Sequence, residues 1–209
     1  MYKIFFHHPF TMILSGPTGS GKTLWIKKLI DNRFTDSYPS PDRIIYFYGE
    51  DQPIFDAIKN VEFSKGLDVA KIECLNPNKR NWLIILDLMN DATNSSIISD
   101  LFTKGSHHRN TSVILTTQNF FSRGKENRNI SLNANYIVLF KNPRDNLLAS
   151  KIARQMYPNR TKWLQNIFED ATRKKYSYLL FDLKPSTPDE VRLLSNVFEE
   201  NGEKMIAYN

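Results

Sequence analysis

The chain has 209 residues, 41% of them hydrophobic, so it can bury a core and suits one α/β domain. Its 28 Lys and Arg residues outnumber its 22 Asp and Glu residues, and the formal charge of +6 is compatible with a nucleic-acid partner without requiring one. A single cysteine excludes an internal disulfide and a cysteine-rich zinc site. No apolar run approaches the roughly 18 residues of a membrane span, so we expect no membrane partner.

The N-terminal segment is apolar over 1–6, but His7, His8 and Pro9 interrupt it. It therefore lacks a continuous signal-peptide core, and we expect an intracellular protein. The paired histidines at 7–8 and 107–108 suggest a metal site, but no i, i+4 pairing supports zinc.

A β-branched apolar stretch at 11–14 leads into the segment 16–23, Gly-Pro-Thr-Gly-Ser-Gly-Lys-Thr, which fits the phosphate-loop pattern at every position. Residues 24–30 follow with helical spacing, so the order is strand, glycine loop and helix, as this motif requires. The alternative is a glycine-rich turn that binds nothing, but it does not account for Lys22 and Thr23 directly after Gly21.

The loop residues have distinct predicted roles in binding ATP. The glycines allow backbone conformations that a Cβ forbids, so the loop N–H groups can form an anion site at a helix N-terminus. Lys22 is predicted to reach the β- and γ-phosphates, and the Thr23 hydroxyl to ligate Mg²⁺. The predicted nucleotide-binding set is Gly16, Pro17, Thr18, Gly19, Ser20, Gly21, Lys22 and Thr23.

Two later apolar runs predict strands that are buried on both faces, as in a parallel sheet. The first covers 43–48 and the second covers 82–87, after a possible short helix at 52–60 and a weakly patterned stretch at 61–77. The second run ends in Asp87, and an acid at the carboxyl end of a strand beside a phosphate loop typically holds Mg²⁺. We therefore pair Asp87 with Thr23 as metal ligands.

Helical spacing at 95–104 precedes a strand at 111–117, and Gln118 follows that strand directly. A Gln in this place can orient the attacking water or sense the γ-phosphate, although an ordinary loop amide is the simpler alternative.

The remaining third of the chain continues to alternate strands and helices. The pattern predicts a mobile basic loop over 120–129, strands at 135–140 and 176–182, and helices from 145 to 157 and over 161–172. The tail at about 186–209 forms a helix at 191–199 or extends to a neighbouring subunit. We expect one phosphate-loop domain over 1–209, with a mainly parallel α/β sheet and helices on both faces.

Several further segments match one family together with the phosphate loop. The chain resembles viral genome-packaging ATPases of the FtsK–HerA superfamily, of the poxvirus and giant-virus type with Polinton and adintovirus-like relatives. The resemblance covers about 8–185 and rests on segments 8–10, 16–23, 86–89, 102–110, 118–119, 130–134 and 140–145.

The resemblance implies a RecA-like fold, ATP hydrolysis, a homo-oligomeric ring and sequence-independent transport of double-stranded DNA into a capsid. It also implies contact with capsid proteins and a place in the host cytoplasm, the nucleus or the virion. Gln118 matches a Gln that is a hallmark of the superfamily. Arg128 and Arg144 are the candidates for the arginine finger that one subunit supplies to its neighbour, and each can instead be a DNA-phosphate contact or a surface charge.

The chain departs from the family at Leu88, because relatives usually have a second acid directly after the metal-binding one. Either Asp87 fills both roles, or Asp91 or another acid serves, or hydrolysis is impaired. The last possibility motivates a second hypothesis, a nucleotide-gated binding or assembly protein with slow turnover. A small-molecule kinase would share the phosphate loop, but Gln118 and the family resemblance argue against it.

Overall fold

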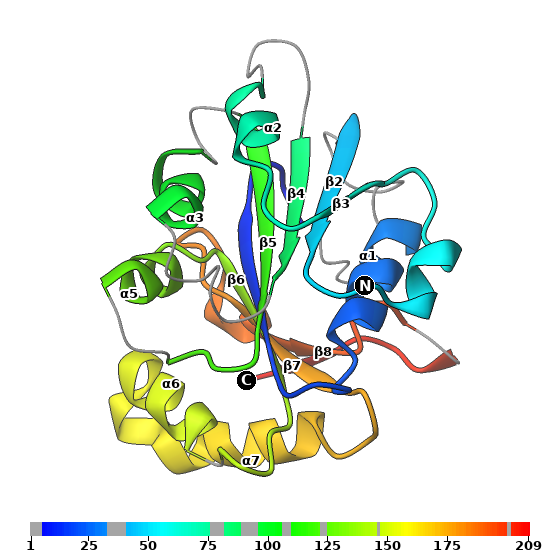
Figure 1. The fold of residues 1–209 in the computed structure, drawn as a ribbon. Helices are drawn as coiled ribbons and strands as arrows, with labels where there is room; N and C mark the ends of the chain where they lie inside the picture. Colours follow the sequence, from blue (N-terminus) through cyan, green and yellow to red (C-terminus); the bar gives the residue numbers. More distant parts are fainter. Residues whose placement is uncertain are drawn as a thin grey trace.

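The computed structural model describes residues 6–32, 41–75, 82–88, 96–105, 110–121, 125–145, 147–199 and 202–209. Within these residues one sheet has nine strands in the order β3-β2-β4-β5-β1-β6-β7-β8-β9 (Figure 1). The strands are β1 (Thr11–Ser15), β2 (Arg43–Tyr48), β3 (Glu62–Lys65), β4 (Trp82–Asp87), β5 (Thr111–Thr117), β6 (Tyr136–Phe140), β7 (Tyr178–Asp182), β8 (Leu193–Ser195) and β9 (Ile206–Tyr208).

Helices connect most of these strands. The α-helices are α1 (Lys22–Asn32), α2 (Val69–Glu73), α3 (Ser96–Asp100), α5 (Lys125–Leu132), α6 (Leu148–Met156) and α7 (Thr161–Ala171). Short turns of other helix types are η1 (Pro53–Ala57), η2 (Leu101–Gly105, a π-helix that continues α3), η3 (Pro158–Arg160) and η4 (Asp189–Val191). No helix in the described ranges is both long and apolar enough to cross a membrane.

The strands β3, β2, β4, β5, β1 and β6, named in their order across the sheet, are all parallel. In contrast, β7, β8 and β9 are antiparallel to their neighbours. The parallel strands β1, β2, β4, β5 and β6 contain buried apolar runs because both faces of the sheet are covered, whereas the edge strand β3 is partly exposed. Successive side chains of β1 point to opposite faces: Ile13 joins one hydrophobic cluster, and Met12 and Leu14 join the other. The predicted α/β class is confirmed.

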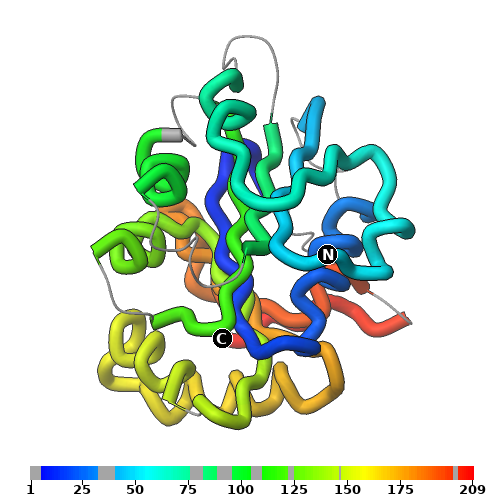
Figure 2. The backbone as a smooth tube through the Cα atoms, in the orientation of Figure 1, coloured from blue at the N-terminus to red at the C-terminus, as the bar shows by residue number. Residues whose placement is uncertain are grey.

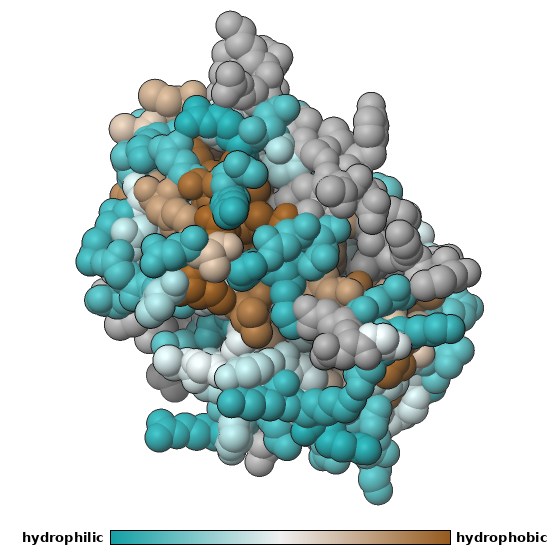
Figure 3. All heavy atoms as spheres, turned by 90° about the vertical axis from the view of Figure 1, so that its right-hand side faces the viewer, coloured by the Kyte–Doolittle hydropathy of each residue, from teal (hydrophilic) through white to brown (hydrophobic). Residues whose placement is uncertain are grey.

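Helices cover both faces of the sheet. Trp25, Ile26 and Leu29 of α1 pack on one face together with the N-terminal aromatic residues Phe6 and Phe10. The other face is covered by α2, α3, α5, α6 and α7. Figure 3 views the side of the molecule on which β2, β3 and α1 lie, where hydrophobic residues show between hydrophilic ones.

The register of the parallel strands sets which residues meet at their carboxyl ends. Leu86 pairs with Leu115, and Ser15 pairs with Thr117, so the ends of β4, β5 and β1 lie at one edge. The phosphate loop, Asp87 and Gln118 each follow one of these ends. β5 lies between β1 and β4, so the residues after β5 are flanked by the loop on one side and by Asp87 on the other.

Three sequence predictions need correction. The segment 120–129 is not a loop throughout, because α5 begins at Lys125 and places Arg128 on a helix. The C-terminal tail forms β8 and β9 instead of a helix at 191–199; the short apolar run 193–195 finds β7 as a partner, and pairing satisfies its backbone groups. Figure 2 shows this red segment beside β7, away from β2 and β3. The last predicted strand begins at Tyr178, so Tyr176 lies in the preceding turn.

Candidate active site

The phosphate loop joins β1 to α1 and is tied to the sheet by its first residue. The Gly16 N–H donates to Thr117 O across 3.1 Å, and a Cβ on Gly16 would lie 2.7 Å from the Phe140 Cβ, so only glycine fits there. Gly21 has a φ of 106°, in the region that disfavours other residues. Its carbonyl accepts from the Trp25 N–H at 2.8 Å, and α1 begins in this turn.

Lys22 lies folded against its own loop. Its Nζ donates to Gly16 O at 2.7 Å and to Pro17 O at 3.0 Å. Burial lowers the pKa of Lys22, and the nearby Asp87 carboxylate acts in the opposite direction. Among the described residues, the direct partners of the ammonium group are these loop carbonyls, in a partly desolvated place where an anion would stabilise its charge.

Asp87 is held by three side-chain donors. Thr116 Oγ1 donates to Oδ1 at 2.5 Å, and Tyr46 OH and Gln52 Nε2 donate to Oδ2 at 2.8 and 3.3 Å. Burial raises the pKa of the Tyr46 hydroxyl, with Asp87 adding to the effect, so Tyr46 stays a donor. These three contacts fix the orientation of the carboxylate at the edge of the sheet.

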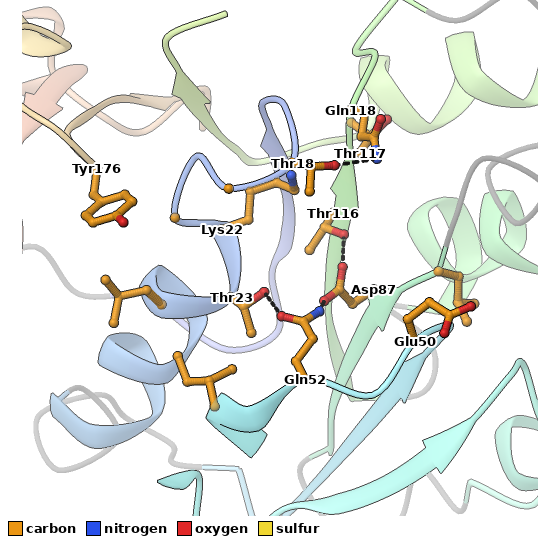
Figure 4. A pocket seen from close by; sticks show the side chains of 15 residues that line it. Thr18, Lys22, Thr23, Glu50, Gln52, Asp87, Thr116, Thr117, Gln118 and Tyr176 are labelled. Atoms are coloured by element: carbon orange, nitrogen blue, oxygen red, sulfur yellow. Dashed lines mark hydrogen bonds between the residues drawn. The ribbon is translucent and has the colours of Figure 1, made fainter. Parts of the chain in front are cut away.

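Gln52 links Asp87 to the phosphate loop (Figure 4). Its Oε1 accepts from Thr23 Oγ1 at 3.0 Å, while its Nε2 donates to Asp87. One amide group thus spans the gap between the hydroxyl and the carboxylate. Both are hard oxygen ligands of the kind that Mg²⁺ prefers. The residues therefore fit a magnesium ion with its waters in the space that the Gln52 amide fills.

Gln118 also contacts the phosphate loop. Its Nε2 donates to Thr18 Oγ1 at 3.1 Å, and both residues are exposed, Gln118 after β5 and Thr18 in the phosphate loop (Figure 4). The contact brings the predicted γ-phosphate residue to the tip of the loop. Lys22, Thr23, Asp87 and Gln118, which the sequence analysis selected separately, all line one pocket of about 610 Å³.

Glu50 and Asp87 are the two acids among the described residues that line this pocket. Glu50 follows β2 at the same edge of the sheet, and the Gly49 N–H donates to Asp87 O at 3.1 Å. Leu88 lines the pocket too, but it packs against the hydrophobic cluster on the far face of the sheet from α1. An apolar side chain suits that place, and Glu50 is the second acid among the described residues of the pocket. Asp91 lies outside the described residues.

The two finger candidates do not line the pocket. Arg128 is exposed on α5, and Arg144 is exposed in the turn after β6. Within the described part of the chain, neither guanidinium makes an ion pair.

His8 contacts Ser112 Oγ at 2.6 Å and Asn110 O at 3.0 Å, so it fastens the N-terminal segment to the start of β5. Residues 107–109 lie outside the described ranges.

Sequence reasoning missed five residues of the site: Tyr46, Glu50, Gln52, Thr116 and Tyr176. One signal could have found two of them. Glu50 and Gln52 closely follow a strongly predicted parallel strand, and ligands bind outside the carboxyl ends of such strands. Tyr46 and Thr116 lie within apolar runs and had no such signal. Tyr176 was placed inside a strand.

A model of the family described as poxvirus A32 protein matches residues 1–183. The chain belongs to the poxvirus A32 protein family. Family membership makes it an ATPase that drives viral genome packaging, as the resemblance implied. A comparison with curated proteins finds no match.

Solved structures support the fold of this A32-family chain. The genome packaging NTPase B204 of Sulfolobus turreted icosahedral virus 2, in complex with ATP-γ-S, has 14% identity and a TM-score of 0.53, with 96% of this chain and 97% of that chain covered. Its sulfate complex has 14% identity and a TM-score of 0.50, with 96% of each chain covered. This likeness shows the RecA-like phosphate-loop fold.

Proposed function

We propose that this A32-family ATPase binds ATP with Mg²⁺ at the phosphate loop and uses its hydrolysis to move double-stranded DNA into a capsid. The main supporting observation is the link from Thr23 through Gln52 to Asp87, with Gln118 on the loop tip. It joins the ends of β1, β4 and β5 around one pocket. Phosphoryl transfer needs chiefly positioning and charge stabilisation, and this arrangement supplies groups for both.

The side chains have separate roles in this proposal. Lys22 leaves the carbonyls of Gly16 and Pro17 and binds the β- and γ-phosphates. Thr23 and Asp87 would hold Mg²⁺ in the space that the Gln52 amide fills. Bound there, Mg²⁺ would neutralise phosphate charge. Gln118 leaves Thr18 to contact the γ-phosphate or the attacking water.

Glu50 is our candidate for the group that activates water. It is exposed, it lines the pocket, and no hydrogen bond or ion pair involving its carboxylate is found within the described residues. It lies beside Asp87 but outside the hydrogen-bond network that fixes Asp87. This assignment accounts for Leu88, because a base after β2 makes a second acid after β4 unnecessary.

An arginine from a neighbouring subunit would complete the site in a ring. Arg128 and Arg144 remain the candidates, and their exposure away from their own pocket supports a role in another subunit's site. Mixed oligomers can test this. One subunit carries Lys22→Ala and keeps both arginines, and the other has an intact phosphate loop but lacks Arg128 or Arg144. In the mixture, the first subunit should supply the arginine to the nucleotide site of the second and so restore turnover. If no mixture restores turnover for either arginine, the proposal for both is wrong.

We place the duplex against basic residues of the ring, contacting phosphates without reading sequence. Lys125 and Arg128 are both exposed on α5 and are our candidates for this contact. The segments 106–109 and 122–124 contain further basic residues and lie outside the described ranges. The same proposal assigns the protein to the host cytoplasm or nucleus, or to the virion, with capsid proteins as partners.

The deciding experiment measures ATP turnover of the purified protein with and without linear duplex DNA. We expect DNA of any sequence to stimulate turnover, and added salt to weaken the effect steeply. Lys22→Ala should abolish turnover. Lys27→Ala is the matched control, because Lys27 lies on the same helix in an ion pair with Asp31. Absence of stimulation at every salt concentration, with an assembled ring, would contradict the motor.

The alternative is a nucleotide-gated assembly protein with slow hydrolysis, which Leu88 favours. In that case Leu88→Asp should raise turnover sharply, whereas our assignment of Glu50 expects no gain. Leu88 packs against the core, so Leu88→Asn serves as a control for lost packing, and melting temperatures are compared for both variants. A parent enzyme that binds ATP tightly with negligible turnover would support the alternative.

A further inference from the structure

Tyr176 lies in the turn between α7 and β7 and is not explained by the proposed chemistry. The turn is closed by the Ser177 N–H and Oγ, which donate to Lys174 O at 3.2 and 2.6 Å. The residue is 45% exposed, and it is the one aromatic residue among the large hydrophobic residues found exposed in the described ranges. It lines the nucleotide pocket together with Gly21 and Lys22.

The backbone at Tyr176 has a φ of 64°, in the left-handed region. The third position of such a turn normally favours glycine or asparagine, because a Cβ is unfavourable there. A bulky residue in this conformation is strained, and such strain clusters at ligand sites. Here the strain has a visible consequence, since the turn holds the ring against the phosphate loop.

The contact between the ring and the loop is close. A Cβ built on Gly21 would lie 3.1 Å from Tyr176 Cδ1 and 3.2 Å from its Cβ. Gly21 therefore leaves space for the Tyr176 side chain because it has no Cβ. It also adopts a positive φ, which disfavours other residues. Lys175 Nζ lies over the ring, 4.7 Å from its centroid, so a cation–π contact covers one face and a ligand would stack on the opposite face.

The direction of a bound nucleotide follows from the two ends of the pocket. Asp87 and Gln118 lie on one side of the phosphate loop, and Tyr176 lies on the other (Figure 4). A γ-phosphate directed toward Asp87 and Gln118 leaves the sugar and base on the side of Tyr176. Lys28, one helical turn beyond Leu24, lines a second hollow with Tyr176, so this flank of α1 faces the same turn.

We infer that the Tyr176 ring is the stacking platform for the nucleobase of the bound nucleotide. The inference rests on the proposed function and adds how the base is recognised. The polar side chains that Figure 4 labels lie toward the phosphate end, whereas the aromatic side chain of Tyr176 lies at the other end. Every nucleobase has a π-face, so stacking holds the base with little selection among bases.

We compare the affinity of the full chain for ATP with its affinity for inorganic tripolyphosphate. Tripolyphosphate has no base, so the comparison distinguishes contacts to the base from contacts to the phosphates. Tyr176→Gly removes the ring and suits the left-handed backbone, so the turn and the melting temperature should be kept. We expect this variant to bind ATP roughly 5- to 100-fold more weakly, and tripolyphosphate as the parent does. Tyr176→Phe should keep the parent affinity for both ligands.

The same binding measurements can overturn the inference. Equal loss of ATP and tripolyphosphate binding in Tyr176→Gly would mean that the turn, and not the ring, matters. Unchanged ATP binding would mean that the base lies elsewhere, with the proposed function intact. If the parent binds neither ligand, or Lys22→Ala binds both as well as the parent does, the proposed function fails along with this inference.

Competition among nucleotides gives an independent readout. With stacking as the main contact, ATP and GTP should compete for the site within a few-fold of each other, ahead of CTP and UTP, because purines stack over a larger area. The purine preference should vanish in Tyr176→Gly. Strong preference for ATP over GTP would indicate hydrogen bonds to the edge of the base. It would contradict the inference that stacking on Tyr176 is the main contact with the base.

Discussion

The side chains of Gln118 and Thr18 are in direct contact, 3.1 Å apart, although 100 positions separate them in the chain. One residue follows β5 and the other is in the phosphate loop. The contact joins the group proposed to detect the γ-phosphate to the loop that would hold it.

Gln118→Ala should lower kcat by about 10²–10³-fold while ATP affinity changes little, because Gln118 would act on the γ-phosphate or water as charge develops. ATP turnover and equilibrium ATP binding are measured side by side. Asn119→Ala is the control, since Asn119 is exposed next to Gln118 and does not line the pocket. A rise in KM with unchanged kcat would instead assign Gln118 to ground-state binding.

Glu50→Gln should lower kcat by about 10²–10⁴-fold and keep ATP binding, because the amide has the same shape but cannot accept a proton from water. Single-turnover hydrolysis measures the chemical step. Asp51→Asn provides the comparison: Asp51 is the adjacent acid, paired with Lys65 at 3.1 Å and absent from the pocket lining. Equal activity of Glu50→Gln and the parent would return the role of base to Asp87 or to an acid outside the described residues.

ATP affinity should fall as the pH rises through the lowered pKa of Lys22. Burial lowers the pKa of Lys22 in the free enzyme, so Lys22 loses its proton at a lower pH than an ordinary lysine does. Phosphate binding favours the charged form, and ATP must therefore be bound with proton uptake above that lowered pKa. Calorimetry in buffers of different ionisation enthalpy detects the uptake.

Lys22→Arg is the control for this pH effect, because arginine stays charged throughout the range. Whatever its affinity, its ATP binding should show no proton uptake over the interval in which the parent does. Proton uptake of the same size in Lys22→Arg would assign the titration to another group.

A substitution at Arg192 tests whether the C-terminal strands β8 and β9 contribute to the stability of the domain. Its guanidinium donates to the carbonyls of Asp182, Lys184 and Thr187 at 3.0, 3.1 and 2.6 Å, and so fastens the connection between β7 and β8. Arg192→Ala should lower the free energy of unfolding by about 2–3 kcal/mol, because these carbonyls lose charged donors. Denaturant unfolding checks this value.

The matched variant is Arg173→Ala, an arginine with 77% side-chain exposure that is paired with Asp170 three positions earlier. Its effect should stay within about 0.5 kcal/mol. If Arg192→Ala is equally mild, the C-terminal strands contribute little to the stability of the sheet.

The amino-acid sequence alone determined the phosphate loop, the parallel α/β class and the positions of Asp87 and Gln118. These features are local: a spaced glycine motif, apolar runs with polar residues at their ends, and helical periodicity each follow from neighbouring residues. The family resemblance added the packaging function, which no local pattern contains.

Only the tertiary structure decided how the site is completed. Gln52 and Tyr46 bond to Asp87, and Glu50 lines the same pocket, because β2 pairs with β4, and pairing between distant strands leaves no local trace in the sequence. Lys125 and Arg128 lie on a helix because α5 packs Ile130 into the core. Tyr176 lies in a strained turn because β7 begins two residues later than the apolar run suggests. Each of these outcomes depends on which surfaces meet in space, and burial against a distant partner outweighs local preference.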